Sequence, residues 1–399
     1  MTYSDTTWQQ TAVHAECGKQ TPCYIFDGDI LKAGVRQMKE ALPHCGALCY
    51  AMKANPFLVG QINPVIDRFE VCSPGEYEIC HREGIDPEKI IVSGVNKTEH
   101  SMARILELSG GKGVFTAESK QHYRILRSLC QQMGCRIRLL VRLSSGNQFG
   151  VDEQDLEEIF RLNQDCDCIE IIGVHYFSGT QKKLKKIEKE LAYLDEYADK
   201  LKKTFGLDRL ELEYGPGLSV SYFAGDKPMS RQGQLEDLEN LLAGLQNFDF
   251  IGIEMGRFMA ADCGCFMSSV DDVKTSDGLN YAIMDSGIHQ LNYFGQMMGM
   301  KLPPIRQIPT REEAEEKEYT LAGALCTVND ILVRDIKLRG LEIGDRLLFQ
   351  RCGAYSMTEG ASLFLSRDLP AVYIYTEQEG YTCLRPGMEI NYLNGKQPE

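Results

Sequence analysis

Eight short apolar segments recur between residues 46 and 254, and longer stretches of helical character separate them. The segments cover residues 46–53, 69–73, 90–94, 113–116, 136–143, 169–176, 210–214 and 249–254. Strands that alternate with helices are typical of a parallel sheet covered on its faces by helices. An open doubly wound sheet would give the same alternation, but the count of eight favours a (β/α)8 barrel of the TIM type, which spans ~250 residues.

The clearest helix of this region is predicted from Lys182 to Lys203. Apolar residues recur there every three or four positions among many lysines and glutamates: Leu184, Ile187, Leu191, Leu194, Ala198 and Leu201. This spacing is that of an amphipathic helix with one buried face.

After Arg257 the alternation of apolar segments with helical stretches ends, and the apolar segments are separated by turns and charged loops. Strands are predicted at 319–326, 345–350 and 371–376. We therefore predict an α/β barrel domain over residues 29–262 and a mostly β domain over residues 263–399. A strand at Cys23–Phe26, within residues 1–28, is expected to join the second domain.

Composition narrows the classes of partner. The chain has 399 residues, of which 43% are hydrophobic and 25% charged, with a formal net charge of −14. An acidic chain is poorly suited to bind nucleic acid or an anionic membrane without sequence preference. We find neither a signal peptide nor a membrane-spanning stretch, so a cytoplasmic protein is expected.

Fifteen cysteines are present, but their spacing does not suggest a metal site. Cys166 and Cys168, like Cys263 and Cys265, are separated by one residue, whereas zinc ligands are separated by two to four. Most of the cysteines are expected to be small buried residues, and no metal is predicted.

One lysine, Lys53, follows directly after the apolar run Cys49–Met52. A lysine at the end of such a strand can extend its ammonium into solvent. Alternatively, a partly desolvated lysine can condense with a carbonyl group, as in enzymes that hold pyridoxal phosphate as a Schiff base. Glu70, within the second strand, is a candidate neighbour of this lysine.

The other strand ends supply what a phosphate-bearing, cationic heteroaromatic cofactor would need. Glycines let backbone N–H groups approach a phosphate, a hydroxyl and a guanidinium can bind it, an aromatic face can stack on the ring, and a carboxylate can keep the ring nitrogen protonated. Gly215 and Gly217 could instead form a tight turn, and Glu254 and Arg257 a structural ion pair. The candidate cofactor residues are Lys53, Phe177, Thr180, Gly215, Gly217, Glu254, Gly256 and Arg257.

Several segments in order resemble the fold-type III pyridoxal-phosphate-dependent amino-acid decarboxylases, the group of ornithine, diaminopimelate and arginine decarboxylases with an alanine-racemase-like barrel. The resemblance covers nearly the whole chain, from Thr21 to Ala371. The segments that carry it are Tyr50–Asn55, Phe69–Glu76, Phe149–Gly150, Glu254–Arg257, Cys326–Asp330 and Gly353–Tyr355. Met255 stands where the family has proline.

The resemblance implies a lyase with a division of labour. Lys53 would carry pyridoxal 5′-phosphate as an aldimine, and Glu254 would keep the ring charged while CO2 leaves through a quinonoid. Cys326 would help to reprotonate the α-carbon, and Tyr355 would meet the phosphate. The family also implies a homodimer with shared active sites, in which Cys326 comes from the partner subunit.

Departures from the family pattern concern the substrate. Thr327 stands where members that bind a distal ammonium have an acidic residue, and Tyr293 aligns with an arginine that clamps a distal carboxylate. With Asp330, these are the candidate substrate residues. They resemble those of decarboxylases whose amino acid is tethered to an acyl carrier protein, but a free amino acid remains an alternative.

Two other functions stay open. A racemase on the same scaffold would need a second base, for which Tyr355 is the one candidate. A non-catalytic relative that binds partners through the dimer surface would be expected to lack some of the cofactor residues, all of which are present. His175 could line the cofactor pocket or bond to neighbouring backbone.

Overall fold

The computed structural model describes residues 19–227 and 229–396. The chain divides into two compact units. The barrel unit comprises Lys32–Val220 and Met229–Met259, and the β unit comprises the described residues of Met1–Leu31, Ser221–Pro228 and Ala260–Glu399.

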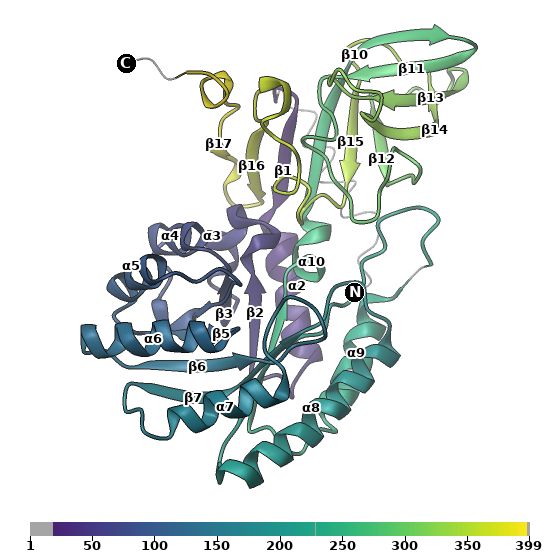
Figure 1. Cartoon of the computed structure of the whole chain (residues 1–399). Coiled ribbons are helices and arrows are strands. Elements are labelled where there is room, and N and C mark those ends of the chain that lie inside the picture. Colours follow the sequence, from purple (N-terminus) through teal and green to yellow (C-terminus); the bar gives the residue numbers. More distant parts are fainter. Residues whose placement is uncertain (1–18, 228, 397–399) are drawn as a thin grey trace. The chain divides into compact units, whose positions relative to one another are not determined.

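The barrel unit is built on eight parallel strands that close into a barrel in chain order (Figure 1). The strands are β2 (Ala47–Ala51), β3 (Arg68–Val71), β4 (Ile90–Val92), β5 (Val114–Ala117), β6 (Ile137–Arg142), β7 (Ile169–Phe177), β8 (Glu211–Gly215) and β9 (Phe250–Met255). β9 pairs with β2 and so completes the ring. The predicted (β/α)8 barrel is therefore confirmed, with each strand within a few residues of its predicted range.

Helices connect successive strands on the outside of the barrel. They are α3 (Val59–Ile62), α4 (Pro74–Arg82), α5 (Glu99–Ser109), α6 (Lys120–Met133), α7 (Glu153–Asn163), α8 (Leu184–Phe205) and α9 (Arg231–Leu242). α2 (Gly28–Ala41) precedes the first barrel strand, β2, and the short α10 (Arg257–Ala260) follows the last, β9. Their ends have local causes: the Thr98 hydroxyl accepts the N–H of Ser101 at the start of α5, and Gly206 adopts φ +64° after α8.

The apolar stripe predicted for the long helix is the buried face of α8, with one exception. Ile187, Leu191, Leu194, Ala198 and Leu201 are buried, whereas Leu184 is 41% exposed. Leu184 is the first residue of the helix.

The β unit contains a nine-stranded sheet (Figure 1). Its strands are β1 (Cys23–Asp27), β10 (Gly264–Ser276), β11 (Leu279–Met284), β12 (Ile305–Ile308), β13 (Glu316–Ala322), β14 (Ile331–Arg339), β15 (Arg346–Gln350), β16 (Ala371–Thr376) and β17 (Gly380–Arg385). β1 lies inside the sheet, antiparallel to β10 and parallel to β16. The N-terminal strand therefore joins the C-terminal sheet, as predicted.

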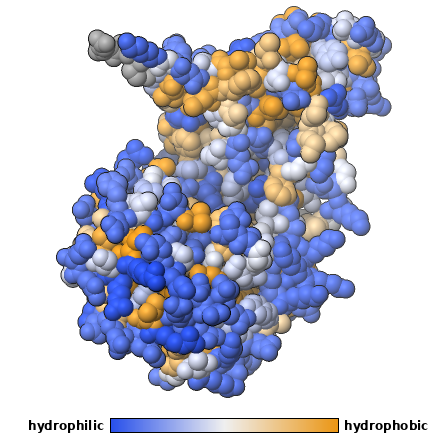
Figure 2. Space-filling view, in the orientation of Figure 1, coloured by the Kyte–Doolittle hydropathy of each residue, from blue (hydrophilic) through white to orange (hydrophobic). Residues whose placement is uncertain are grey.

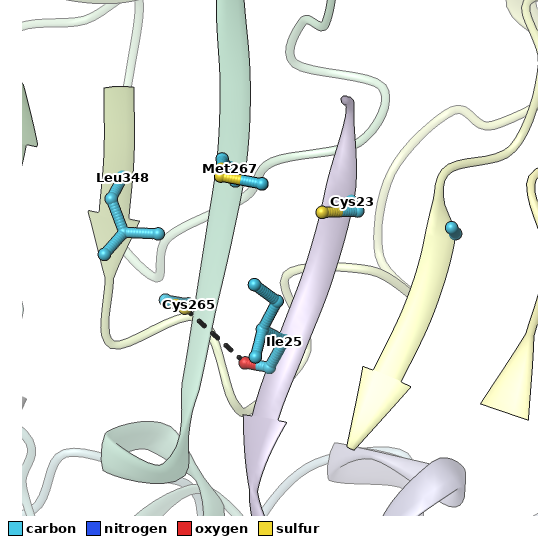
Figure 3. Close-up of a cluster of buried hydrophobic side chains, with 6 residues drawn as sticks. Cys23, Ile25, Cys265, Met267 and Leu348 are labelled. Atoms are coloured by element: carbon cyan, nitrogen blue, oxygen red, sulfur yellow. Dashed lines mark hydrogen bonds between the residues drawn. The ribbon is translucent and has the colours of Figure 1, made fainter. Parts of the chain in front are cut away.

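Part of the core of the β unit is a cluster on four of these strands, with Ala371 as its member on β16. Figure 3 shows Cys23 and Ile25 of β1 beside Cys265 and Met267 of β10, with Leu348 of β15. The Cys265 thiol donates to the Ile25 carbonyl at 3.6 Å. These cysteines are buried and free, and they pack as small apolar residues.

One predicted strand is longer than the observed one. The segment 319–326 was predicted to be extended throughout, but β13 ends at Ala322. At Gly323 the chain turns around Asp330, since the Gly323 N–H donates to the Asp330 carbonyl at 2.8 Å. Cys326 therefore lies in a loop.

Hydrophilic side chains cover most of the visible barrel unit, whereas apolar side chains gather on the visible face of the β unit over β16 and β17 (Figure 2). No helix in the described part of the chain combines the length and apolar character needed to cross a membrane.

Candidate active site

Lys53 lies in a 3-10 turn, Met52–Ala54, that directly follows β2. Its ammonium contacts the carboxylate of Glu70 on β3 and lies 3.4 Å from the Cys72 sulfur and 3.7 Å from Glu254 Oε1. The side chain is 34% exposed. Lys53 is therefore held between two carboxylates at the carboxyl end of the barrel strands, where active sites of this architecture are formed.

Glu254, near the end of β9, is buried and paired on two sides. Its Oε2 lies 3.1 Å from His175 Nε2, and Oε1 faces Lys53. Burial alone would raise the pKa of this carboxyl, but the Lys53 ammonium and the hydrogen bond from His175 outweigh it and hold the pKa at about 2. Glu254 is therefore an anion while Lys53 beside it is a free ammonium.

His175, on β7, is buried and bonds to the Glu254 carboxylate rather than to neighbouring backbone. Among the described residues, its Nδ1 has no hydrogen-bond partner. His175 therefore lies beside Glu254, as expected of a residue that lines the pocket, and not in a hydrogen bond to neighbouring backbone.

Two loops that contain the predicted phosphate residues lie against each other beyond β7 and β8. A Cβ on Gly217, whose φ is +60°, would lie 2.2 Å from the Gly179 carbonyl oxygen and 3.1 Å from Thr180 Cα. A Cβ on Gly215 would lie 2.4 Å from a ring carbon of Phe177. Only glycine fits at either position, so backbone rather than side chains forms this surface.

Gly256 and Arg257 complete the set after β9. A Cβ on Gly256 would lie 2.9 Å from both the Ala51 carbonyl oxygen and Ala54 Cβ, so this glycine lets β9 end beside the turn of Lys53. Arg257 is the first residue of α10 and is buried.

The remaining predicted residues lie in the β unit. Cys326 is exposed and Thr327 is half-buried in the loop after β13. Tyr355 adopts φ +65°, and its carbonyl accepts the N–H groups of Thr358 and Glu359 at 3.1 Å. A positive φ at a non-glycine residue is strained, and such strain is frequent at functional sites.

Asp330, one of the predicted substrate residues, has a structural role that the sequence did not indicate. The residue was predicted to contact substrate, but its side chain is buried and occupied by backbone. Oδ1 accepts the Ile288 N–H at 2.8 Å, and Oδ2 accepts the Leu325 N–H at 2.7 Å. A carboxylate with two charge-assisted bonds to backbone fixes a loop, and this loop is the one that carries Cys326 and Thr327.

Tyr293 also has a different environment from the one predicted. Its hydroxyl donates to the Gln350 carbonyl at 2.7 Å, and its ring meets the rings of Tyr222 and Phe223 edge-on at 5.8 and 5.9 Å. Burial raises the pKa of Tyr293 well above its usual value. The hydroxyl is therefore engaged inside the β unit, although the residue also lines a cavity of about 270 Å³.

Two further charged residues at strand ends were not predicted. Arg142 ends β6 and donates to the carboxylate of Glu118, which follows β5, at 3.0 Å; both side chains are buried. Reading every strand end, including those of β5 and β6, would have found them.

Residues 29–261 match the family described as the pyridoxal-binding domain of pyridoxal-dependent decarboxylases. The chain belongs to this family. Family members use pyridoxal phosphate, and the arrangement around Lys53 is the part of this chain that would hold it.

Relatives along the whole chain support the assignment. The L-glutamyl-[BtrI acyl-carrier protein] decarboxylase of Niallia circulans is 24% identical over 397 residues, covering 92% of this chain and 91% of the relative. The diaminopimelate decarboxylase of Pseudomonas aeruginosa is 28% identical over 366 residues, covering 84% and 83%.

Solved structures share the fold. The diaminopimelate decarboxylase of M. jannaschii in complex with L-lysine has a TM-score of 0.83 at 19% identity, over 95% of this chain and 92% of that one. The lysine/ornithine decarboxylase of Vibrio vulnificus complexed with putrescine has a TM-score of 0.80 at 22% identity, over 94% and 99%.

Proposed function

We propose that this chain is a pyridoxal-phosphate-dependent α-decarboxylase of an amino acid whose distal end carries no charge. The observation that carries the proposal is the position of Lys53, between the carboxylates of Glu70 and Glu254 at the carboxyl end of the barrel strands. When bound, pyridoxal phosphate supplies an electron sink for the electron pair left by a departing carboxylate.

The residues of the barrel unit fit this cofactor. Lys53 offers the amine for its aldehyde, and Glu70 lies close enough to accept a proton from that amine. Glu254, ionised and fixed by His175, is suited to keep a proton on a ring nitrogen. Arg257, Thr180 and the backbone at Gly215 and Gly217 would bind the phosphate, with Phe177 against the ring.

In the β unit, Cys326 would return a proton to the α-carbon. Its exposed thiol suits a donor that serves the site of a partner subunit, so a homodimer with shared active sites is part of the proposal. Exposed apolar residues support it: Leu363, Phe364 and Leu365, joined through Asn394 to Tyr392 and Leu393. Such patches mark interfaces more often than free surface. A cytoplasmic location stays a prediction.

The substrate is proposed from Thr327 and Tyr293. Thr327 offers no charge to a distal ammonium, and Tyr293 offers none to a distal carboxylate. A neutral distal group, such as an amide or a thioester on an acyl carrier protein, is consistent with both. The name of the Niallia circulans relative describes a substrate of this kind, a glutamyl group on a carrier protein.

Trapping the cofactor tests the chemistry. Wild-type chain with pyridoxal phosphate should absorb above 400 nm, and borohydride reduction should fix the cofactor on the peptide that contains Lys53. Lys53→Ala should lose the absorption and the adduct, whereas Lys203→Ala, 75% exposed on α8, should keep both. A colourless wild type, or an adduct on another lysine, would refute the proposal.

A substrate panel tests the reaction. Free amino acids and carrier-tethered glutamate and aspartate would be assayed for CO2 release and for loss of optical activity. CO2 release is expected, with the neutral-ended substrates preferred. Racemisation without CO2 would support the alternative enzyme, and release from free diaminopimelate or ornithine at the highest rate would contradict the proposed distal pocket.

A further inference from the structure

A second lysine, Lys182, lies buried behind the two glycine loops. Its side chain is 2% exposed. The ammonium donates to the carbonyl of Gly215 at 3.0 Å and to Oε2 of Glu190 at 2.6 Å, and it lies 4.9 Å from the centre of the Tyr214 ring. Burial lowers the pKa of Lys182, and the Glu190 carboxylate opposes that effect.

Glu190, on α8, accepts hydrogen bonds from residues next to both loops. It accepts hydrogen bonds from the Ser178 hydroxyl, from Lys182, and from the Tyr214 hydroxyl at 2.7 Å. Ser178 follows β7, and Tyr214 precedes Gly215 at the end of β8. One carboxylate and one ammonium therefore connect the segment that contains Thr180 with the segment that contains Gly215 and Gly217.

The backbone of Lys182 strengthens this connection. Its N–H donates to the Gly217 carbonyl at 2.9 Å, and its carbonyl accepts the Ser219 hydroxyl at 3.2 Å. A Cβ on Gly217 would lie 3.0 Å from Lys182 Cε, so the lysine stem passes directly beneath this glycine.

A purely structural ion pair is a poor explanation for the arrangement. A buried ion pair can often be replaced by apolar residues of similar volume without loss of stability, because desolvation offsets the attraction. This ion pair, however, connects the two loops that form the candidate phosphate site.

We propose that Lys182 is a positioning residue of the phosphate site, which holds the two glycine loops in register, so that the chain selects the phosphorylated cofactor. The inference rests on the proposed function, because it takes pyridoxal phosphate as the ligand. Lys182 acts through Gly215 and Gly217 and need not touch the phosphate.

The test compares two ligands that differ only in the phosphate. Dissociation constants of the full chain for pyridoxal phosphate and for pyridoxal would be measured by titration, for wild type and for Lys182→Met. The preference for the phosphorylated ligand is the dissociation constant for pyridoxal divided by that for pyridoxal phosphate. This ratio should fall at least about tenfold in the variant, about 1.4 kcal/mol, with the affinity for pyridoxal nearly unchanged. The 31P resonance of the bound cofactor should move toward that of free cofactor.

Control variants separate this role from a structural one. Lys186→Met removes an exposed ammonium that lies 3.8 Å from the same Glu190 carboxylate, and it should leave the ratio unchanged. Lys182→Arg should retain part of the preference for pyridoxal phosphate that Lys182→Met loses. Because Lys182→Met leaves Glu190 buried without its cation, the double variant Lys182→Met/Glu190→Gln is measured as well, and the same fall in ratio is expected.

Equal losses for both ligands, or an unchanged ratio in the single and double variants, would refute the inference while leaving the proposed function intact. A wild type that binds neither ligand would refute both.

Discussion

The buried carboxyl of Glu213 makes the stability of the barrel unit depend on pH. Glu213 lies on β8 with its side chain 1% exposed, and it accepts a hydrogen bond from Arg68 Nη1 at 3.1 Å. Burial raises the pKa of Glu213 from 4.5 to about 8, because the single guanidinium only partly offsets the loss of water. The perturbation is Glu213→Gln, which keeps the shape and removes the titration.

The direction of the pH effect depends on whether the folded or the unfolded chain holds the Glu213 proton more tightly. The folded chain keeps the Glu213 proton up to about pH 8, whereas the unfolded chain loses it near pH 4.5. The contribution of Glu213 to the free energy of unfolding is therefore greatest below pH 4.5, falls as the pH rises, and levels off above pH 8. At about 1.36 kcal/mol per pKa unit, the part of this loss between pH 6 and pH 9 amounts to about 2.7 kcal/mol.

The assay is urea unfolding followed by circular dichroism at 222 nm, at pH 6 and pH 9, with cofactor saturating throughout. The signal reports the barrel unit, since α3 to α9 all lie there. Between pH 6 and pH 9, the free energy of unfolding should fall by about 2.7 kcal/mol more in wild type than in Glu213→Gln. Glu170→Gln, at an exposed position of β7, should behave as wild type. Parallel losses in wild type and Glu213→Gln would refute the reasoning.

Three further outcomes are expected. Gly217→Ala should weaken cofactor binding at least about tenfold, because its Cβ would lie 2.2 Å from a carbonyl oxygen. The control Gly206→Ala, also at positive φ but with open space around it, should change only the free energy of unfolding, by about 1 kcal/mol. Asp330→Asn should speed amide hydrogen exchange in the loop around Cys326 and lower turnover, since a neutral amide binds the two N–H groups less strongly; unchanged exchange would contradict the anchoring role. In the cofactor-free chain, the Glu254 carboxyl should show no titration by carbon NMR between pH 4 and pH 7, because the Lys53 ammonium and His175 hold its pKa at about 2; a titration in that range would contradict this assignment.

Much of the barrel was predictable because its strands are short apolar runs with polar residues at their carboxyl ends. Lys53 and Glu254 were found in this way, and the structure brings them within 3.7 Å. Their chemical roles remain proposals, but their proximity followed from topology alone: the carboxyl ends of parallel strands meet at one end of a barrel.

What escaped prediction depends on contacts between distant parts of the chain. Lys182 stands in a lysine-rich stretch, where the pattern indicates a solvated face, and only the approach of Glu190 and the β8 loop makes it buried. The substrate roles of Asp330 and Tyr293 stay predictions, but the hydrogen bonds of their side chains to the backbone of Ile288, Leu325 and Gln350 were not predicted.

The place of β1 in the sheet has a consequence for synthesis of the chain. Cys23–Asp27 is synthesised well before Ala371–Thr376, the strand with which it pairs in parallel. The barrel strands are complete by Met255 and can close during translation, whereas β1 must keep one edge unpaired for more than a hundred further residues. An exposed edge of this kind is prone to pair with other chains. Truncation before Ala371 would therefore remove the parallel neighbour of β1, a strand that is distant from it in sequence.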